Sequence, residues 1–292
     1  MLLSERRLGP KLYGVFAGGR LEEYIPSRNM TFPEFKDPVF GKAIARKFAV
    51  IHRLDVPINK HPNWLLDTLD LWAQTAIDYH TDPNNSLNIQ NPKLETDLYA
   101  FDYKSELKWL RQLLTTCGSP PVFSHNDLSE TNVLIPDDST AYADGIVFID
   151  FEWAHYNYRG FDIANYFTKF MFDFSTPEYP RVRCDHNAYP NDYEKRVFIR
   201  EYIKHSKGLT CDKQTEDQMV KEADYFALSA HLLWALWCLN KCHSSGVQTF
   251  GFNTLERLSG YVHNKDYLMA TAQLYAIPYT QFAALVTKRL FH

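Results

Sequence analysis

The sequence has little excess charge and no long hydrophobic run. Its 31 basic residues are outnumbered by 35 acidic residues, which gives a formal net charge of −4. A general nucleic-acid or membrane-surface binder is usually basic, so both classes are disfavoured. The most apolar segment, residues 225–239, has 15 residues and is too short to span a bilayer, so we predict a buried helix there. We expect no nucleic-acid partner and no membrane insertion, although a local basic pocket for one small phosphate compound remains compatible with this charge.

Cysteine is scarce as well, and its distribution does not predict a disulfide scaffold. The five cysteines are scattered and contain no C-x-x-C pair, as is typical of free thiols in a reducing compartment. Cys238 and Cys242 stand four residues apart and could share a metal, but no second ligand pair has matching spacing. The first residues become polar and charged too early for a signal peptide. We therefore predict a cytoplasmic protein.

What is present is enough apolar chain for a sizeable core. The 292 residues are 45% hydrophobic and 15% aromatic, which excludes a disordered chain. This length allows one large domain or two unequal lobes.

Local patterns predict an α+β fold. Two β-like runs, 11–16 and 20–25, are joined by a glycine-containing link and indicate a hairpin that Pro26 ends. Two further β-like runs, 132–135 and 145–149, flank a polar turn. Helical periodicity marks 39–54 and 107–114, a polar loop or insertion is expected at 81–95, and the chain is mainly helical after Asp162.

The run His125-Asn126-Asp127-Leu128-Ser129-Glu130-Thr131-Asn132 has the form H-x-D-L-x-x-x-N, the catalytic-loop pattern of kinases. In that pattern the aspartate meets a substrate hydroxyl, and the asparagine reaches a metal on the nucleotide phosphates. Asn126 stands where protein kinases place arginine.

A second motif follows 18 residues later, where an apolar run ends in Asp150-Phe151. Its position and form match the second magnesium-binding aspartate of kinases. Either motif alone is weak, because a lone H-x-D is often only a hydrogen-bonded turn. Their order, spacing and intervening hairpin together predict a phosphoryl-transfer site.

The segment F-I-D-F-E-W-A-H-Y-N-Y-R-G-F-D-I-A-N-Y-F, residues 148–167, closely resembles the signature of choline/ethanolamine kinases. The opening segments L-S-E-R-R-L-G-P-K-L-Y-G-V-F and G-R-L-E-E-Y-I-P-S-R are similar to the part of that family that leads into the nucleotide hinge, and H-L-L-W-A-L-W at 231–237 resembles its late tryptophan helix. The resemblance runs from residue 2 to about residue 262. It implies a protein-kinase-like fold with a mainly helical C-terminal lobe, residues 27–292, and a small β remnant of the nucleotide-binding lobe and hinge, residues 1–26.

The resemblance also implies the activity and its reagents. The family transfers the γ-phosphate of ATP, with Mg²⁺, to the hydroxyl of choline or ethanolamine, the first step of phosphatidylcholine and phosphatidylethanolamine synthesis. The substrate would be a small amino alcohol, and homodimers are common in the family.

Residue roles follow from the same resemblance. The proposed catalytic and metal-binding residues are Asp127, Asn132 and Asp150, with the backbone around Glu23 and Ile25 facing adenine. His125 and Asp162 would support the catalytic loop, with a local ion pair between Arg159 and Asp162 as the alternative. Glu152 is either a carboxylate of the cation site or a structural partner.

Aromatic faces are natural binding groups for a quaternary ammonium, which has no N–H donors. Trp234 and Trp237 share a helix face, and Trp153 and Trp64 match aromatic positions of the family. Each is predicted to line the cation site, with core packing as the alternative.

Several positions depart from the family. Lys169 replaces a glutamate near the cation, and Phe174, Phe252 and Leu255 replace tyrosines. No G-x-G-x-x-G loop and no strand lysine of the V-A-I-K type precede the hinge segment. Two alternatives therefore stay open: a truncated, non-catalytic member that binds substrate or partner only, and a kinase for another small hydroxyl compound, such as a relative of the aminoglycoside phosphotransferases.

Overall fold

The computed structural model describes the chain except residues 1, 83–91, 139, 141 and 272–292. The chain forms two compact units, each built from three separate stretches. The first unit comprises Met1–Pro62, Pro120–Asp162 and Pro190–Val220. The second unit comprises Asn63–Ser119, Ile163–Tyr189 and Lys221–His292. Because the chain passes between the units several times, neither unit is a continuous segment of sequence.

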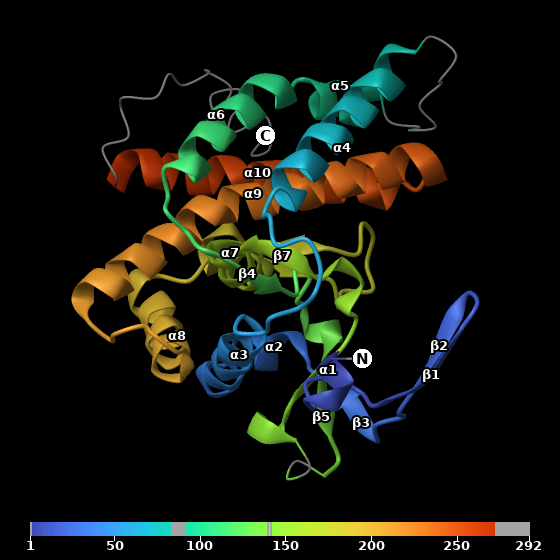
Figure 1. Ribbon diagram of the computed structural model, residues 1–292. Helices are drawn as coiled ribbons and strands as arrows, with labels where there is room; N and C mark the ends of the chain where they lie inside the picture. Colours follow the sequence, from blue (N-terminus) through green and yellow to red (C-terminus); the bar gives the residue numbers. More distant parts are fainter. Residues whose placement is uncertain (1, 83–91, 139, 141, 272–292) are drawn as a thin grey trace. The chain divides into compact units, whose positions relative to one another are not determined.

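The described residues of the first unit form three small antiparallel sheets (Figure 1). The hairpin of β1 (Leu12–Phe16) and β2 (Gly19–Glu22) turns at Gly18, whose positive φ of 84° suits glycine. The order β3-β5-β6 makes a second sheet, with β3 (Ser27–Asn29), β5 (Val133–Pro136) and β6 (Val147–Phe148). The third sheet joins β4 (Pro121–Ser124) to β7 (His155–Tyr158).

Helices α3 (Pro38–Ile51) and α8 (Asp192–His205) pack together in the first unit and supply its core. The Asp37 side chain caps α3 by accepting a hydrogen bond from the Val39 amide, and Pro38 occupies the first helical position, where proline is favourable. The buried ring of Phe48 on α3 meets Phe148 edge to face, with ring centroids 5.7 Å apart. The unit also holds two short helices, α1 (Leu2–Glu5) and α2 (Phe32–Lys36).

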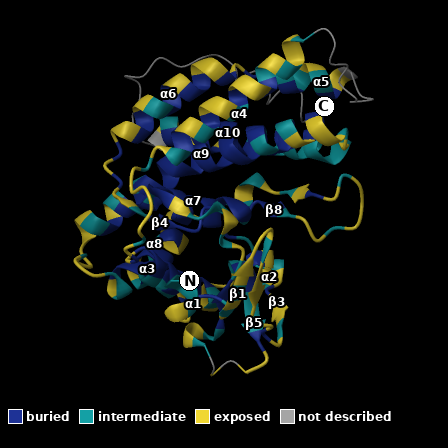
Figure 2. Cartoon of the chain, turned by 45° about the vertical axis from the view of Figure 1, so that its right-hand side comes forward, coloured by how far each residue is buried: buried dark blue, intermediate teal, exposed yellow. Residues whose placement is uncertain are grey.

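The second unit is mainly helical, and so is the described part of the chain after Asp162, as predicted. Its helices and strands are α4 (Trp64–Thr81), α5 (Pro92–Tyr99), α6 (Tyr103–Thr115), α10 (Gln248–Thr271) and the short antiparallel pair β8 (Phe172–Asp173) and β9 (Arg183–Cys184). Two helices begin in the first unit and continue into the second, α7 (Arg159–Lys169) and α9 (Lys213–Ser245). Figure 2 shows the dark blue, buried face of α9 and the buried inner sides of its neighbouring helices.

Most predicted elements are confirmed. The two hairpins, the helices at 39–54 and 107–114 and the buried helix at 225–239 are all present. The strand predicted at 20–25 is shorter than expected, because β2 ends at Glu22, before Pro26. The polar loop predicted at 81–95 is wrong at both ends: α4 extends to Thr81, and α5 begins at Pro92, where proline favours the first turn of a helix. Residues 83–91 of that segment lie outside the described residues. Among the described residues, no helix combines the length and the apolar character that crossing a membrane requires.

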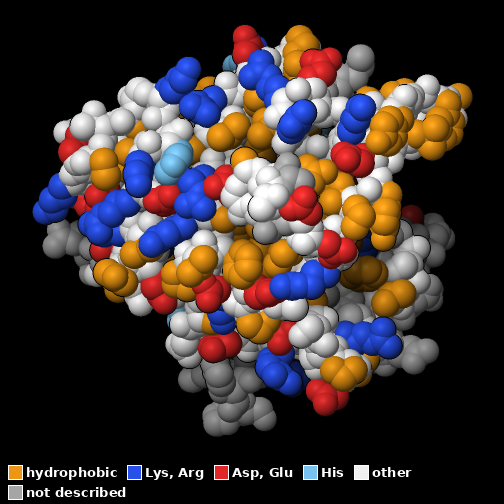
Figure 3. Space-filling view, turned by 90° about the horizontal axis from the view of Figure 1, so that it is seen from below, with side chains coloured by type: hydrophobic (Ala, Val, Ile, Leu, Met, Phe, Trp, Pro, Cys, Tyr) orange, Lys and Arg blue, Asp and Glu red, His pale blue; other side chains and the backbone are white. Residues whose placement is uncertain are grey.

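The surface agrees with the nearly balanced charge. Basic and acidic side chains are interspersed on the face shown in Figure 3. Hydrophobic side chains gather on the β1–β2 hairpin, where Val15 is 72% exposed and Leu21 60% exposed. They form the orange projection at the upper right of Figure 3.

Candidate active site

The H-x-D-L-x-x-x-N loop begins where β4 ends, and one buried carboxylate holds its first residues. The Asp162 side chain is fully buried in the first turn of α7. Its Oδ2 accepts a hydrogen bond from the His125 amide at 2.7 Å, and its Oδ1 accepts one from the Asn126 amide at 2.7 Å. His52 Nε2 lies 3.1 Å from the same Oδ2. Because a buried carboxylate is stable only with such partners, Asp162 and the loop backbone stabilise one another.

His125 links the loop to the strand that leads to Asp150. Its Nε2 lies 2.9 Å from the Ile149 carbonyl oxygen, and the Asp127 amide lies 3.3 Å from its Nδ1. These contacts require the tautomer in which Nε2 carries the proton and Nδ1 accepts. The buried side chain of His125 therefore connects the two motifs by binding to backbone groups of each.

Asn126 makes a second link, to the segment that follows Asp150. Its Nδ2 donates to the Trp153 carbonyl oxygen at 2.8 Å, and its Oδ1 accepts from Asn157 Nδ2 at 2.8 Å. The φ of Asn126 is 68°, in the left-handed region that asparagine tolerates better than most residues. Asn157 and His52 were not predicted as site residues. Asn157 lies inside the 148–167 motif, which was a usable signal, whereas the sequence around His52 carries none.

Asn132 immediately precedes β5, and Asp150 follows its paired strand β6. Asn132 Nδ2 donates to the Asp127 carbonyl oxygen at 2.9 Å, and the Ile149 amide donates to the Asn132 carbonyl oxygen at 3.0 Å. The first bond directs the amide nitrogen toward the loop, which leaves the amide oxygen as the atom for a cation. Asp150 is exposed, with a left-handed φ of 61°. An amide oxygen and a carboxylate are ligands that Mg²⁺ prefers, so these two residues fit the metal that the motif predicts.

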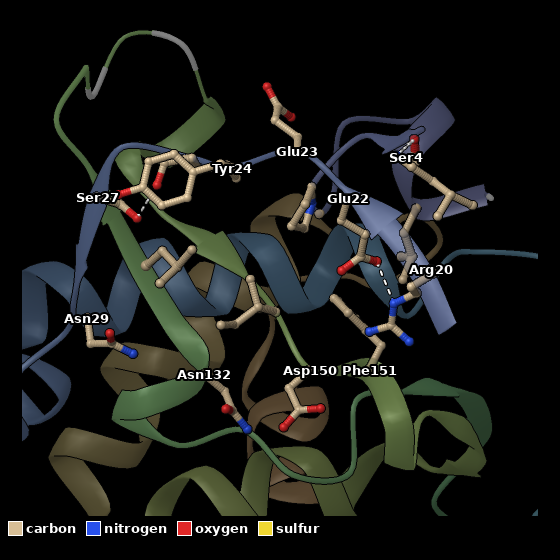
Figure 4. A pocket seen from close by; sticks show the side chains of 17 residues that line it. Ser4, Arg20, Glu22, Glu23, Tyr24, Ser27, Asn29, Asn132, Asp150 and Phe151 are labelled. Carbon is tan, nitrogen blue, oxygen red and sulfur yellow. Dashed lines mark hydrogen bonds and ion pairs between the residues drawn. The ribbon is translucent and has the colours of Figure 1, made fainter. Parts of the chain in front are cut away.

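Both residues line a cavity of about 710 Å³ in the first unit. The cavity is also lined by the segment Glu23, Tyr24 and Ile25, so the structure brings the predicted adenine-facing residues to the same hollow (Figure 4). In Figure 4 the side chains of Asn132 and Asp150 lie in the lower part of the view, and Glu23 and Tyr24 lie in its upper part. Asp127, half-buried in the catalytic loop, is not among the residues that line this cavity.

Hydrogen bonds of backbone and side-chain groups shape the hinge segment. The Glu23 amide donates to the Lys11 carbonyl oxygen at 2.7 Å, and the Glu23 carboxylate accepts from the Lys11 amide at 3.0 Å. The Ile25 carbonyl accepts from the Ser27 hydroxyl at 2.8 Å. These bonds hold an extended backbone along one wall of the cavity.

The remaining predicted residues of the first unit lie close to Asp150 in sequence. Glu152 is exposed and Trp153 half-buried in the short 3₁₀ helix Phe151–Trp153. Arg159, buried at the start of α7, donates its amide to the Pro120 carbonyl oxygen at 2.9 Å.

The predicted tryptophan pair lies on α9 in the second unit. The Trp234 and Trp237 rings meet edge to face, with centroids 6.1 Å apart. Trp234 is buried, its Nε1 donates to Asn165 Oδ1 at 2.8 Å, and Lys169 Nζ lies 4.8 Å from its ring centroid. A cation of the chain itself therefore already occupies one face of Trp234.

Trp237 lines a second hollow, of about 400 Å³, together with Trp72 and Tyr79 of α4. Lys241 Nζ lies 5.6 Å from the Trp237 ring centroid. Trp64, the first residue of α4, is half-buried and is not one of the residues that line this hollow.

Comparison with known proteins gives consistent matches. The family model for choline/ethanolamine kinase matches residues 1–262. A human choline/ethanolamine kinase is 36% identical over 256 residues, covering 86% of this chain and 62% of the relative. Choline kinase A2 of Caenorhabditis elegans is 34% identical over 296 residues, covering 91% of this chain and 68% of the relative. The chain thus spans about 62% of the length of the human relative.

Two solved structures share the fold. The choline kinase of Cryptosporidium parvum superposes with a TM-score of 0.76 at 24% identity, covering 93% of this chain and 77% of that one. The ethanolamine kinase of Plasmodium vivax gives a TM-score of 0.73 at 23% identity, covering 89% and 68%. The predicted α+β fold of the protein-kinase-like type is confirmed.

Proposed function

The chain belongs to the choline/ethanolamine kinase family, and from that premise we propose that it transfers the γ-phosphate of ATP to the hydroxyl of choline or ethanolamine. One observation carries the proposal. Asn132 and Asp150 line the same cavity as the Glu23–Ile25 segment. Hydrogen bonds connect Asn132 and the strand before Asp150 to the loop that bears Asp127.

Asp127 would act on the substrate hydroxyl. As the hydroxyl oxygen bonds to the γ-phosphorus, its proton passes to the Asp127 carboxylate, and the bond to the β-bridging oxygen breaks to release ADP. The position of this carboxylate depends on Asp162 and His125, because their hydrogen bonds fix the backbone on either side of Asn126. A loop held in this way needs little rearrangement when substrate binds.

Asn132 and Asp150 would hold Mg²⁺ through one amide oxygen and one carboxylate. The ion supplies charge neutralisation on the transferring phosphate. Adenine would pair with the Glu23 carbonyl and the Ile25 amide N–H, since the Glu23 N–H and the Ile25 carbonyl already bond within the protein.

The amine end of the substrate would meet aromatic rings. Trp234, Trp237, Trp153 and Trp64 remain the proposed lining, with Glu152 as the carboxylate. Lys169 limits binding at Trp234, because its ammonium group lies over that ring. Either this group leaves the ring face, or the amine of the substrate binds to another ring. We also propose a cytoplasmic enzyme at the start of phospholipid synthesis, and a homodimer remains a prediction.

The test is a phosphoryl-transfer assay on the purified chain with ATP, Mg²⁺ and either amine. We expect turnover that falls by about 10²- to 10⁴-fold in Asp127→Asn, because that variant cannot accept the hydroxyl proton. Asp137→Asn is the matched control, since Asp137 is exposed in the same unit, and it should leave kcat unchanged.

Turnover that survives Asp127→Asn contradicts the proposal. If both amines are inert while another small hydroxyl compound is phosphorylated, the substrate class is wrong. Amine binding without any turnover would instead support the non-catalytic alternative.

A further inference from the structure

A group of metal-binding side chains lies in the second unit, formed by elements that the proposed reaction does not use. Cys184 ends β9, His186 begins the 3₁₀ helix His186–Ala188, and Glu256 lies on α10. One ligand atom from each of the three lies within 4.8 Å of the others. All three side chains are half-buried, so the group is shielded but reachable from solvent.

The contacts of His186 aim one ring nitrogen at the cysteine. His186 Nδ1 lies 3.2 Å from Cys184 Sγ, while Nε2 lies 2.9 Å from the Ser259 hydroxyl on α10. When Nε2–H donates to Ser259, Nδ1 presents its lone pair toward the sulfur. A metal-binding histidine usually has this arrangement, in which a hydrogen bond on the second nitrogen fixes the tautomer and the ring.

We propose that Cys184, His186 and Glu256 bind one zinc ion. Tetrahedral zinc with Zn–S and Zn–N bonds near 2.3 and 2.0 Å separates its ligand atoms by roughly 3.5 Å. The distance between Cys184 Sγ and His186 Nδ1 already agrees with this separation. Glu256 Oε2 lies 3.9 Å from His186 Nε2, so zinc binding would draw this carboxylate toward Cys184 Sγ and His186 Nδ1, with water in the fourth position.

The ligand atoms, one sulfur, one nitrogen and one oxygen, indicate which metal is bound. A thiolate and an imidazole favour zinc over Mg²⁺, which prefers oxygen ligands such as those of Asn132 and Asp150. Zinc binds the deprotonated thiolate, so binding would release the Cys184 thiol proton to solvent.

The consequence of binding is local to the second unit. Zinc would tie residues 183–188 to α10, two segments that no disulfide joins. This group differs from the pair considered in the sequence, Cys238 and Cys242, which are both buried on α9. Cys184 and Glu256 are far apart in the chain, so ligand spacing could not reveal them.

The experiment titrates the chelator-treated full chain, without nucleotide, with Zn²⁺ by calorimetry and with Co²⁺ by absorption. We expect one equivalent of Zn²⁺ and a thiolate-to-cobalt charge-transfer band. Cys184→Ser should abolish the band, and Glu256→Gln should weaken Zn²⁺ binding. Ser259→Ala should weaken binding by about 10- to 100-fold, because the ring of His186 loses its orientation.

Cys211→Ser is the matched control. Cys211 is more exposed than Cys184, and its Sγ lies 3.9 Å from the Glu216 carboxylate. Its removal should leave the affinity and the band unchanged. If Cys184→Ser does not fold, Glu256→Gln and Ser259→Ala still test the site, with circular dichroism to verify folding.

Three results would overturn the zinc site. The first is the absence of Zn²⁺ binding to the wild-type chain. The second is a charge-transfer band that persists in Cys184→Ser, and the third is a band lost in Cys211→Ser instead. None of these readouts depends on kinase activity, so failure here is separate from failure of the proposed reaction.

Discussion

A set of polar side chains in the first unit and a set in the second unit lie in different surroundings. In the first unit, Asp162, His125 and Asn126 bond mainly to backbone amides and carbonyls of loops. In the second unit, Lys169 and His243 contact aromatic rings. A hydrogen bond to the backbone requires a narrow range of distance and angle, so it fixes the position of both groups. A ring contact mainly provides burial and the negative face of the ring.

This difference predicts which properties of the protein change when residues of each unit are substituted. Substitutions among the loop contacts of the first unit should reduce both stability and kcat, because they release the backbone around Asp127. Substitutions in the second unit should change pH dependence or KM, because burial and ring faces act on charge. The following predictions test this contrast.

The largest effect on stability is expected at Asp162. Asp162→Ala leaves the His125 and Asn126 amides without their buried acceptor, so we expect a loss of about 3 kcal/mol in the free energy of unfolding. Asp162→Asn keeps one acceptor oxygen and should lose less. Urea unfolding measures both, and kcat should fall in parallel.

Asp137→Ala serves as the control, because this exposed aspartate should change stability by less than about 0.5 kcal/mol. The contrast fails if Asp162→Ala is no less stable than this control.

An intermediate effect is expected at His243. Its ring stacks on Tyr79 with centroids 4.2 Å apart, and burial lowers its pKa from 6.5 to about 4. Between these values the unfolded chain binds a proton that the folded chain does not, so stability falls as pH decreases from 6.5 to about 4. We expect this histidine to account for about 2 kcal/mol of that loss, allowing for partial solvent screening.

Urea unfolding at pH 7.5 and 4.5 measures the loss. His243→Phe keeps the stacked ring but removes the titrating group, so its stability should fall less with acid. His61→Gln, at an exposed position, should keep the wild-type pH dependence. Equal pH dependence in wild type and His243→Phe would show that His243 does not titrate as a buried group.

The smallest effect is expected on the Trp234 face. Lys169→Met removes the ammonium group from this ring and should lower KM for choline by about 5-fold, about 1 kcal/mol. Trp234→Leu should raise KM by a similar factor with little change in kcat. Initial-rate kinetics with choline measure both.

Lys221→Met is the matched control, because the Lys221 ammonium group lies 5.3 Å from the ring centroid of Tyr225, which is not part of the proposed lining, so KM should stay unchanged. If Trp234→Leu lowers stability and leaves KM unchanged, Trp234 is a core residue, and core packing is the correct interpretation of the tryptophan pair.

Much of the fold follows from local patterns. Alternation and a glycine link predicted the β1–β2 hairpin, and helical periodicity predicted α3 and α6. The end of the loop at 81–95 was harder to predict, because a proline such as Pro92 can either break a helix or be its first residue, as it is in α5.

The sequence by itself determined the family and the order of Asp127, Asn132 and Asp150, because these residues flank one short hairpin whose length is set by their spacing. The tertiary structure alone decided which side chains from distant segments come together. His52 reaches Asp162 across 110 residues, Lys169 covers Trp234, and Glu256 approaches Cys184 and His186. Such contacts depend on how helices pack after they form, and side-chain packing between distant segments leaves no periodic signal in the chain.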